Sequence, residues 1–302
     1  MAELVDDAVP SGPGDRPVTG APEQVVVADP PPEPDYPRYR VEPGEPARLA
    51  ERDPDETERY ARKKDVAGEL ATARKRIADL QARLYAEHRR SVLIVLQAMD
   101  TGGKDGTIKG VFQGVNPQGC QVWSFKAPSA EERDHDFLWR YHQRVPPVGM
   151  IHIFNRSHYE DVLVVRVKSL VPEAVWRKRY EAINDFERQL TAGGVTLVKF
   201  FLQISREEQR RRLQARLDDP SKHWKFSSND LAERARWEDY QLAFEEALTR
   251  CSTPYAPWYV VPANVKWFRN LVVARTIADT LAAMDPQYPA AEADLDRVTI
   301  PA

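Results

Sequence analysis

The sequence predicts an α/β fold in which a mainly parallel β-sheet of five strands is covered by helices on both faces. Strongly apolar runs alternate with helical patterns along the chain, and these runs are apolar at nearly every position. Strands buried on both faces have this continuous pattern, whereas strands with one face in water alternate between apolar and polar residues. Ligands of such sheets bind beside the carboxyl ends of the strands, so the polar segments that follow the strands are the first candidates for a functional site.

The composition supports a folded protein with a sizeable core. The chain has 302 residues, of which 42% are hydrophobic and 29% are charged, and its formal net charge is −3. This charge excludes a polycation, so an anionic partner must be met by a local basic patch. The two cysteines, Cys120 and Cys251, lack the spacing of a disulfide framework or a zinc site, which fits a reducing compartment.

Residues 1–50 are predicted to form an unstructured, proline-rich extension, and residues 51–302 a folded domain. Proline fixes φ and lacks an amide hydrogen, so neither a helix nor a strand can propagate through the extension. The first ten residues are acidic and do not resemble a signal peptide, and no apolar run reaches the ~20 residues that span a bilayer. We therefore expect a cytoplasmic protein that does not enter a membrane.

The first regular elements are a helix predicted over 56–90 and a strand over 92–96. Apolar residues of the helix recur at steps of three, four and seven, which is typical of one buried face. These residues are Val66, Leu70, Ile77, Leu80 and Leu84. Its other faces carry many lysines and arginines, which is the usual pattern of a solvated surface but also places positive charge beside the first strand.

The first strand leads into a turn that contains Gly102, Gly103 and Gly106, with Lys104 inside it, and a helix follows. This order is typical of a phosphate-binding loop. Glycines let the backbone amides wrap phosphate oxygens, the helix N-terminus adds the positive end of a dipole, and the lysine adds a point charge.

The match to the general pattern G-x-x-x-x-G-K-[ST] is imperfect, because Ala98 replaces the first glycine and Asp105 replaces the Ser or Thr. A plain tight turn is the structural alternative. Asp100 favours the functional interpretation, since a carboxylate at the mouth of an anion-binding loop repels phosphate unless a cation lies between them. We therefore expect Mg²⁺, which carboxylates and phosphate oxygens share.

The rest of the chain continues the alternation of strands and helices. The further strands are expected at 121–125, 150–154, 195–204 and 258–261. The further helices are expected near 131–143, 172–191, 206–216 and 230–250, and from 266 onward. Three polar clusters then follow three strands: the glycine loop after the first, Asn155-Arg156 after the third, and the arginine-rich helix after the fourth. In a parallel sheet these clusters should meet at one edge.

Phosphoryl transfer requires positioning, charge neutralisation and a metal, and this edge offers residues for each task. Lys104 and the loop amides would hold the phosphate that moves, and Asp100 would hold Mg²⁺. Asn155 stands where an acidic metal ligand is expected, so Glu160 or Asp161 would supply the missing charge.

Each of these residues also has a structural alternative. Asn155 could cap the helix that follows it, and Arg156 could either clamp phosphates or form a structural ion pair. Most arginines of 206–216 should lie on a solvated face, and Arg212 and Arg216 share a face by their four-residue spacing.

Several segments resemble the polyphosphate kinase 2 family over about residues 57–285. They are AMDTGGKDG from residue 98, IHIFNRSHYEDVLV from residue 151, and the stretch from DDPSKHWKFSSND at residue 218 to VKWFRN. The resemblance implies a P-loop kinase-like three-layer sandwich similar to thymidylate kinase, with a helical lid over about 206–235. It also implies a reversible, Mg²⁺-dependent phosphorylation of nucleotides by inorganic polyphosphate.

The resemblance also assigns roles to residues. Asp100 and Lys104 match the loop aspartate and lysine of the family, Arg156 matches its arginine after the third strand, and Arg216 falls at a lid arginine, with Lys222 and Lys225 in the same lid. Asn155 departs from the aspartate of many members. FNRSHYEDV resembles the subgroup that acts on both nucleoside mono- and diphosphates, and Asp161 is the preferred substitute ligand.

The complete prediction is a kinase that phosphorylates AMP and ADP, and GMP and GDP as further acceptors. Its predicted catalytic residues are Asp100, Lys104, Arg156 and Asp161. Its predicted phosphate- and substrate-binding residues are Gly102, Gly103, Asp105, Gly106, Thr107, Lys109, Asn155, Arg212, Arg216, Lys222 and Lys225. Its predicted ligands for Mg²⁺ or Mn²⁺ are Asp100, Asn155, Glu160 and Asp161.

Two other functions remain open at this point. One is an ATP-dependent nucleotide or nucleoside kinase, and the other is a non-catalytic protein that binds an anion or RNA. No recognisable nucleic-acid module accompanies the basic clusters, so we expect no specific nucleic acid partner. The family resemblance implies a homo-oligomer, either a dimer or a tetramer.

Overall fold

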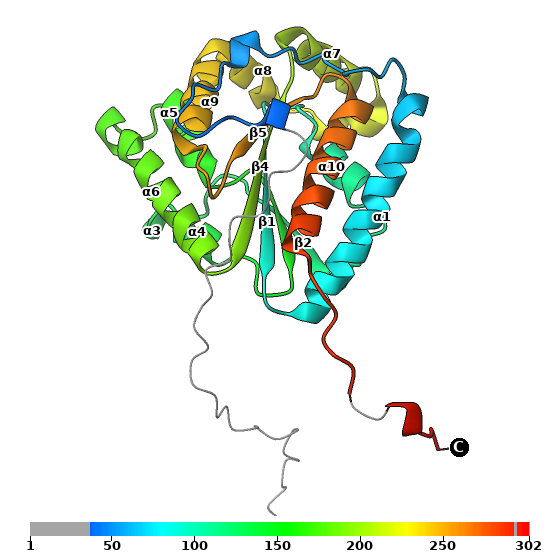
Figure 1. Cartoon of the computed structure of the whole chain (residues 1–302). Helices are drawn as coiled ribbons and strands as arrows, with labels where there is room; N and C mark the ends of the chain where they lie inside the picture. Colours follow the sequence, from blue (N-terminus) through cyan, green and yellow to red (C-terminus); the bar gives the residue numbers. More distant parts are fainter. Residues whose placement is uncertain (1–36, 293–294, 302) are drawn as a thin grey trace, which may run out of the picture.

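The computed structural model describes residues 37–292 and 295–301. Its centre is one sheet of five parallel strands in the order β2-β3-β1-β4-β5 (Figure 1). The strands are β1 (Ser91–Gln97), β2 (Cys120–Ser124), β3 (Ile151–Asn155), β4 (Val195–Gln203) and β5 (Trp258–Pro262). The prediction of an α/β fold with a five-stranded parallel sheet is confirmed.

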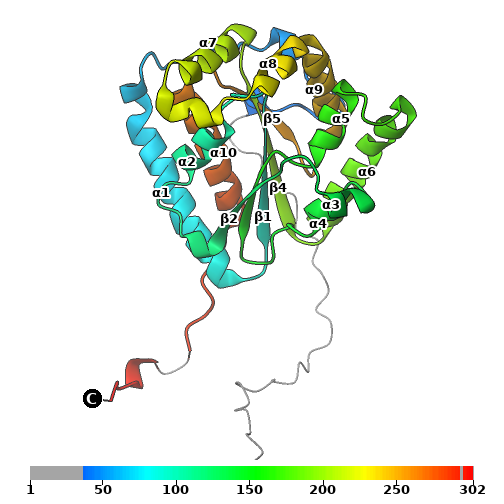
Figure 2. The ribbon, with the colours of Figure 1, turned by 180° about the vertical axis from the view of Figure 1, so that it is seen from behind.

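Helices cover both faces of this sheet and form the outer layers of a three-layer sandwich (Figures 1 and 2). One face carries α1 (Lys63–Glu87), α2 (Lys104–Val111) and α10 (Lys266–Met284). The other carries α3 (Ala130–Asp134), α4 (Trp139–His142), α5 (Val164–Val167), α6 (Glu173–Ala192) and α9 (Trp237–Cys251). Above the end of the sheet lie α7 (Arg206–Leu217), the 3₁₀ helix η5 (Pro220–Lys225) and α8 (Ser228–Ala235). No helix among the described residues is long and apolar enough to cross a bilayer.

The central strands explain the continuous apolar runs of the sequence. Every residue of β1 and β5 is buried, and so are all residues of β4 except one. The side chains of Leu93, Ile94, Val95 and Leu96 have no exposed surface, because helices cover both faces of β1. This rigid centre fixes the positions at which the polar loops leave the strands.

Residues 37–50 pack against the domain, so the expectation of an unstructured segment is wrong for this part. Tyr39, Val41, Ala47 and Leu49 are buried, and the Val41 amide donates to the Trp258 carbonyl at 2.8 Å. The strand β5 forms an edge of the sheet with unpaired backbone groups, and an irregular, proline-containing segment can satisfy some of them. The remainder of the predicted extension, 1–36, lies outside the described residues.

Three predicted helices differ from the observed ones. The first begins at Lys63 instead of residue 56, where the Arg62 amide donates to the Asp65 carboxylate at 2.9 Å. The helix expected near 131–143 is two short helices, α3 and α4, and the helix expected over 230–250 is divided into α8 and α9 at Arg236. The Arg62–Asp65 hydrogen bond caps the first helix, and an apolar pattern does not reveal such a cap.

Candidate active site

The three polar clusters meet at one edge of the sheet, as their positions after parallel strands predict. Arg156, after β3, donates to Asp100 of the loop after β1 with Nη2 and Oδ1 at 2.8 Å. The side-chain amide of Asn155 donates to the Asp105 carboxylate at 2.7 Å. From α7, Gln209 donates to the Asp100 carbonyl at 3.1 Å. These contacts join the loops that follow β1, β3 and β4.

The glycine loop has a backbone that only small residues allow. A Cβ on Gly102 would lie 2.4 Å from the Ala98 Cβ and 2.8 Å from the Met99 carbonyl oxygen. Gly103 has φ of 102°, in the left-handed region that favours glycine. The loop runs directly into α2, whose first-turn amides have no partner within the helix and can point at an anion.

Lys104 lies at the start of α2 and bends back over the loop. Its Nζ donates to the Ala98 carbonyl at 3.1 Å. Burial, and then the neighbouring charge of Arg156, lower the pKa of Lys104 to about 8. The carboxylates of Asp100, Glu160 and Asp105 act in the opposite direction. A phosphate in the loop would add further negative charge and favour the charged lysine.

Arg156 links the loop to the acidic residues that follow β3. Its backbone has φ of 62°, which is rare for a residue other than glycine, and such strain clusters at functional sites. Its guanidinium pairs with Asp100 and reaches Glu160 at 3.9 Å. The charge of Glu160 raises the pKa of Arg156 against the effect of burial. The ion pair that the sequence left as an alternative is thus present, at the mouth of the loop.

Asp161 has different partners from those that the sequence suggested. Its Oδ1 accepts from Arg179 of α6 at 2.8 Å, and Tyr141 donates to its Oδ2 at 3.4 Å. Burial raises the pKa of Asp161 to about 6, against the opposing charge of Arg179. Of the two acidic residues, it is Glu160 that contacts Arg156 and whose charge acts on Lys104. We therefore prefer Glu160 to Asp161 as the carboxylate that accompanies Asp100.

Arg212 was expected to contact the substrate, but it contacts only the protein. Protein acceptors occupy all three nitrogens of its guanidinium group. The acceptors are Glu208 for Nε (2.6 Å), the carbonyls of Thr101 (3.0 Å) and Gly102 (3.1 Å) for Nη1, and those of Ala263 (2.6 Å) and Asn264 (3.1 Å) for Nη2. Arg212 therefore holds the glycine loop against the loop that follows β5, and no donor remains for phosphate.

The predicted lid residues contact one another. Arg216 Nη1 donates to the Asp230 carboxylate and to the Lys225 carbonyl, both at 3.1 Å. Lys222 pairs with Asp219 at 2.6 Å, and Lys225 Nζ lies 4.9 Å from the centre of the Trp224 ring. Asp230 of the lid is close enough to the site for the charge of Asp100 to add to the effect of burial, and both raise the pKa of Asp230.

The remaining predicted residues divide between the loop and the surface. Thr107 is buried and donates to the Gly103 carbonyl at 3.1 Å, which stabilises the first turn of α2. Gly106 lies in that turn, and Lys109 is exposed in the last turn. Sequence reasoning missed Gln209 and Asp230. Gln209 could have been predicted from the sequence, since it stands three residues before Arg212 on the same helix face. Nothing in the sequence pattern of the lid singles out Asp230.

The donor set at this edge fits a hard cation such as Mg²⁺, although the protein alone forms no complete site. Among the described residues, no three His, Cys, Asp or Glu side chains are close enough to hold an ion. Asp100, Asp105, Glu160 and Asn155 offer oxygen atoms near Lys104. Mg²⁺ commonly takes one or two carboxylates and completes its shell with water and substrate phosphates, so an incomplete protein site is compatible with this ion.

Comparisons with known proteins agree with this geometry. Residues 60–289 match the model of the family described as polyphosphate kinase 2. The chain is 53% identical over 264 residues to the AMP/ADP-polyphosphate phosphotransferase of Meiothermus ruber, covering 87% of this chain and 99% of the relative. It is 46% identical to the ADP-polyphosphate phosphotransferase of Rhodopseudomonas palustris, over 83% of this chain and 91% of the relative.

The crystal structure of polyphosphate kinase 2 from Arthrobacter aurescens TC1 superposes with a TM-score of 0.83 at 45% identity, covering 89% of this chain and 96% of that chain. The resemblance that the sequence motifs indicated is thereby confirmed. The extent and the level of these matches together show that the chain belongs to the polyphosphate kinase 2 family.

Proposed function

We propose that this protein transfers the terminal phosphate of inorganic polyphosphate to AMP and ADP in a reversible reaction. The observation that carries the proposal is the joining of Lys104, Asp100 and Arg156 at the carboxyl edge of a parallel sheet, beside a glycine loop. Relatives that act on AMP and ADP with polyphosphate align along nearly the whole folded part of the chain. The site offers groups for phosphate and for a cation, which are the requirements of phosphoryl transfer.

In this proposal the transferred phosphate lies over the amides at the start of α2, with Lys104 neutralising its charge. Phosphate oxygens compete with Asp100 for the Arg156 guanidinium, so substrate binding opens the ion pair seen between them. Arg156 then stabilises the charge that spreads over the transferred group. The attacking group of AMP or ADP is a phosphate oxygen that carries no proton at neutral pH, so the reaction requires no strong base.

We further propose that Asp100, together with Glu160 and the Asn155 carbonyl oxygen, holds Mg²⁺ or Mn²⁺ jointly with the phosphates. The ion would screen the repulsion between the carboxylates and the polyphosphate chain. Opening the Asp100–Arg156 pair releases the Asp100 oxygen for this role. Arg216 of the lid completes the neutralisation of charge when it exchanges Asp230 for phosphate.

The test supplies polyphosphate as the sole donor, with Mg²⁺ and each of AMP, ADP, GMP and GDP. We expect product with AMP and ADP, and a fall of about 10²–10³-fold in rate for Lys104→Ala, because a preorganised charge at the transferred group is lost. Lys64→Ala, at an exposed lysine of α1, is the matched control and should keep the wild-type rate. Near-normal turnover by a folded Lys104→Ala variant would contradict these roles.

The same assay separates the two rival functions. An ATP-dependent kinase would give product only when ATP replaces polyphosphate. A non-catalytic anion- or RNA-binding protein would bind polyphosphate without Mg²⁺ dependence and without turnover. The predictions of guanine nucleotides as acceptors, of a dimer or tetramer, and of a cytoplasmic location remain predictions, which the acceptor panel, light scattering of the purified protein and cell fractionation would check.

A further inference from the structure

Arg269 of α10 is a buried arginine that lies directly against the glycine loop. Its side chain is almost completely buried, with the whole residue 2% exposed. Its Nη1 lies 2.0 Å from the position that a Cβ on Gly103 would take, and its Nη2 lies 3.4 Å from the corresponding position on Gly106. The guanidinium therefore occupies the space that two glycines leave open at the start of α2.

The hydrogen bonds of Arg269 do not neutralise its charge. Both Nε and Nη2 donate to Oδ1 of Asn270, at 3.1 and 2.8 Å, and this acceptor is a neutral amide. Within residues 37–292 and 295–301, no carboxylate forms an ion pair with Arg269, and Nη1 has no hydrogen-bond acceptor. The neighbouring Arg212 differs, because its Nε is paired with Glu208 at 2.6 Å.

The charges that surround Arg269 are positive as well. Arg212 Nη1 is 3.5 Å from the same Cβ position on Gly103. Burial, and then the charge of Arg212, lower the pKa of Arg269 to about 9, far below the usual range of arginine. The positive end of the α2 dipole adds to this repulsion. A buried cation without a counterion destabilises a folded protein unless an anion binds beside it.

We propose that Arg269 is a donor-binding residue whose counterion is the polyphosphate chain held in the glycine loop. This inference rests on the proposed function and adds to it the path that the donor chain takes from the glycine loop. The phosphates that follow the transferred group lie on the α10 side of the loop, between Gly103 and the N-terminus of α10, and Nη1 donates to one of their oxygens.

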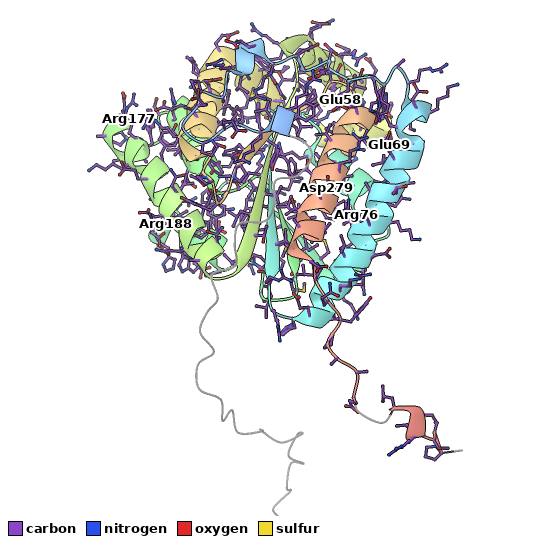
Figure 3. All side chains as sticks on the ribbon, viewed as in Figure 1. Glu58, Glu69, Arg76, Arg177, Arg188 and Asp279 are labelled. Carbon is purple, nitrogen blue, oxygen red and sulfur yellow. The ribbon has the colours of Figure 1, made fainter. Side chains whose placement is uncertain are left out.

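Arg269→Met tests the proposal, because methionine keeps much of the side-chain length and removes the charge. Arg76→Met is the matched control. Arg76 of α1 pairs at the surface with Asp279 of α10, and Figure 3 shows both residues between these two helices. For each protein, the KM for polyphosphate and for ADP is measured, together with the melting midpoint with and without tripolyphosphate.

We expect Arg269→Met to raise the KM for polyphosphate by at least about tenfold, the effect of losing one hydrogen bond to a charged group, while the KM for ADP changes less than about twofold. The free variant should melt above the wild type, since an uncompensated buried charge is gone, and tripolyphosphate should raise its midpoint less than that of the wild type. Arg76→Met should keep both KM values and the wild-type response to tripolyphosphate.

A lower melting midpoint with an unchanged KM for polyphosphate would overturn the proposal and make Arg269 a structural support of the loop. Failure of both Arg269→Met and Arg269→Gln to fold would overturn it in the same way. The proposed function can fail separately. If the wild type makes no ATP from polyphosphate, the proposed function is wrong, and the tripolyphosphate shifts of the folded proteins still decide whether Arg269 binds the anion.

Discussion

At the scale of single residues, several cations lie around the glycine loop, and only some of them have a carboxylate partner. Lys104, Arg156 and Arg269 surround one loop, and burial lowers the pKa of Lys104 to about 8 and that of Arg269 to about 9. Each would gain from a bound polyanion, whose charge repeats at every phosphate unit. The preference for polyphosphate therefore follows from the concentration of positive charge around the loop, and it requires no contact with a nucleobase.

Lys104 should lose its proton near pH 8 in the free, metal-free enzyme. Below that pH the amine is protonated and unreactive toward an acylating reagent, and above it the neutral amine reacts. Competitive labelling of Lys104 followed by mass spectrometry should therefore give a midpoint near 8, compared with about 10.4 for lysine in a model peptide. Added polyphosphate should move the midpoint upward. A midpoint at or above 10 in the free enzyme would contradict the described environment.

The choice of residues at the site could be predicted from the sequence only in part. Asp100, Lys104 and Arg156 were identifiable, because each closely follows a strand of a parallel sheet and such residues meet at one edge. The sequence could not predict that Glu160 contacts Arg156 whereas Asp161 pairs with Arg179. Both lie in one 3₁₀ turn after β3, and the direction of each side chain depends on Arg179 of α6, a helix whose packing no strand pattern specifies.

At the scale of elements, Arg212 connects three segments that are distant in sequence. It joins α7, the glycine loop and the loop after β5, and it leaves no guanidinium nitrogen free. Arg212→Met should lower the free energy of unfolding by about 3–5 kcal/mol, because four backbone carbonyls would lose their donor and Glu208 would keep only Arg211 as its partner. Urea denaturation measures this change, and activity should fall because the loop loses its support.

Arg210→Met is the control for that experiment. Arg210 lies on the same helix and pairs with Glu207 at the surface, where both side chains are well exposed. Its replacement should leave the denaturation midpoint unchanged. If Arg212→Met unfolded at the same urea concentration as Arg210→Met, Arg212 would not hold these elements together.

The sequence predicted that the helices exist, but not the residues at which they begin and end. The apolar stripe predicted α1, yet its start at Lys63 depends on a hydrogen bond between the Arg62 amide and Asp65. The boundary between α8 and α9 at Arg236 likewise lies inside a segment whose pattern predicts one helix. An apolar period shows that a helix exists, whereas its ends depend on caps and tertiary contacts.

At the scale of the whole molecule, residues 37–50 close one edge of the sheet. The Ala47 amide donates to Thr249 at 3.0 Å, and the Leu49 amide donates to Glu245 at 2.7 Å, so the segment also crosses α9. Proline content predicted disorder here, but prolines exclude only regular hydrogen bonding and not burial. The buried apolar residues of the segment are spaced irregularly, so no period revealed them.

Two truncations test this segment. A chain that starts at residue 37 keeps the contacts of Tyr39, Val41, Ala47 and Leu49, and a chain that starts at residue 51 loses them. The second chain should be less stable by several kcal/mol, since burying one large apolar side chain contributes about 1.5–3 kcal/mol. Thermal unfolding compares the two. Equal melting midpoints would show that residues 37–50 do not stabilise the domain.

The central claim is that a polyphosphate chain, together with a divalent cation, binds at the edge where β1, β3 and β4 end. A crystal structure with tripolyphosphate, AMP and Mn²⁺ tests it most directly, because anomalous scattering locates the metal. The account predicts phosphate over the amides of Gly102–Lys104, the metal beside Asp100, and Arg156 turned from Asp100 to phosphate. Phosphate and metal bound elsewhere, with the Asp100–Arg156 pair intact, would contradict it.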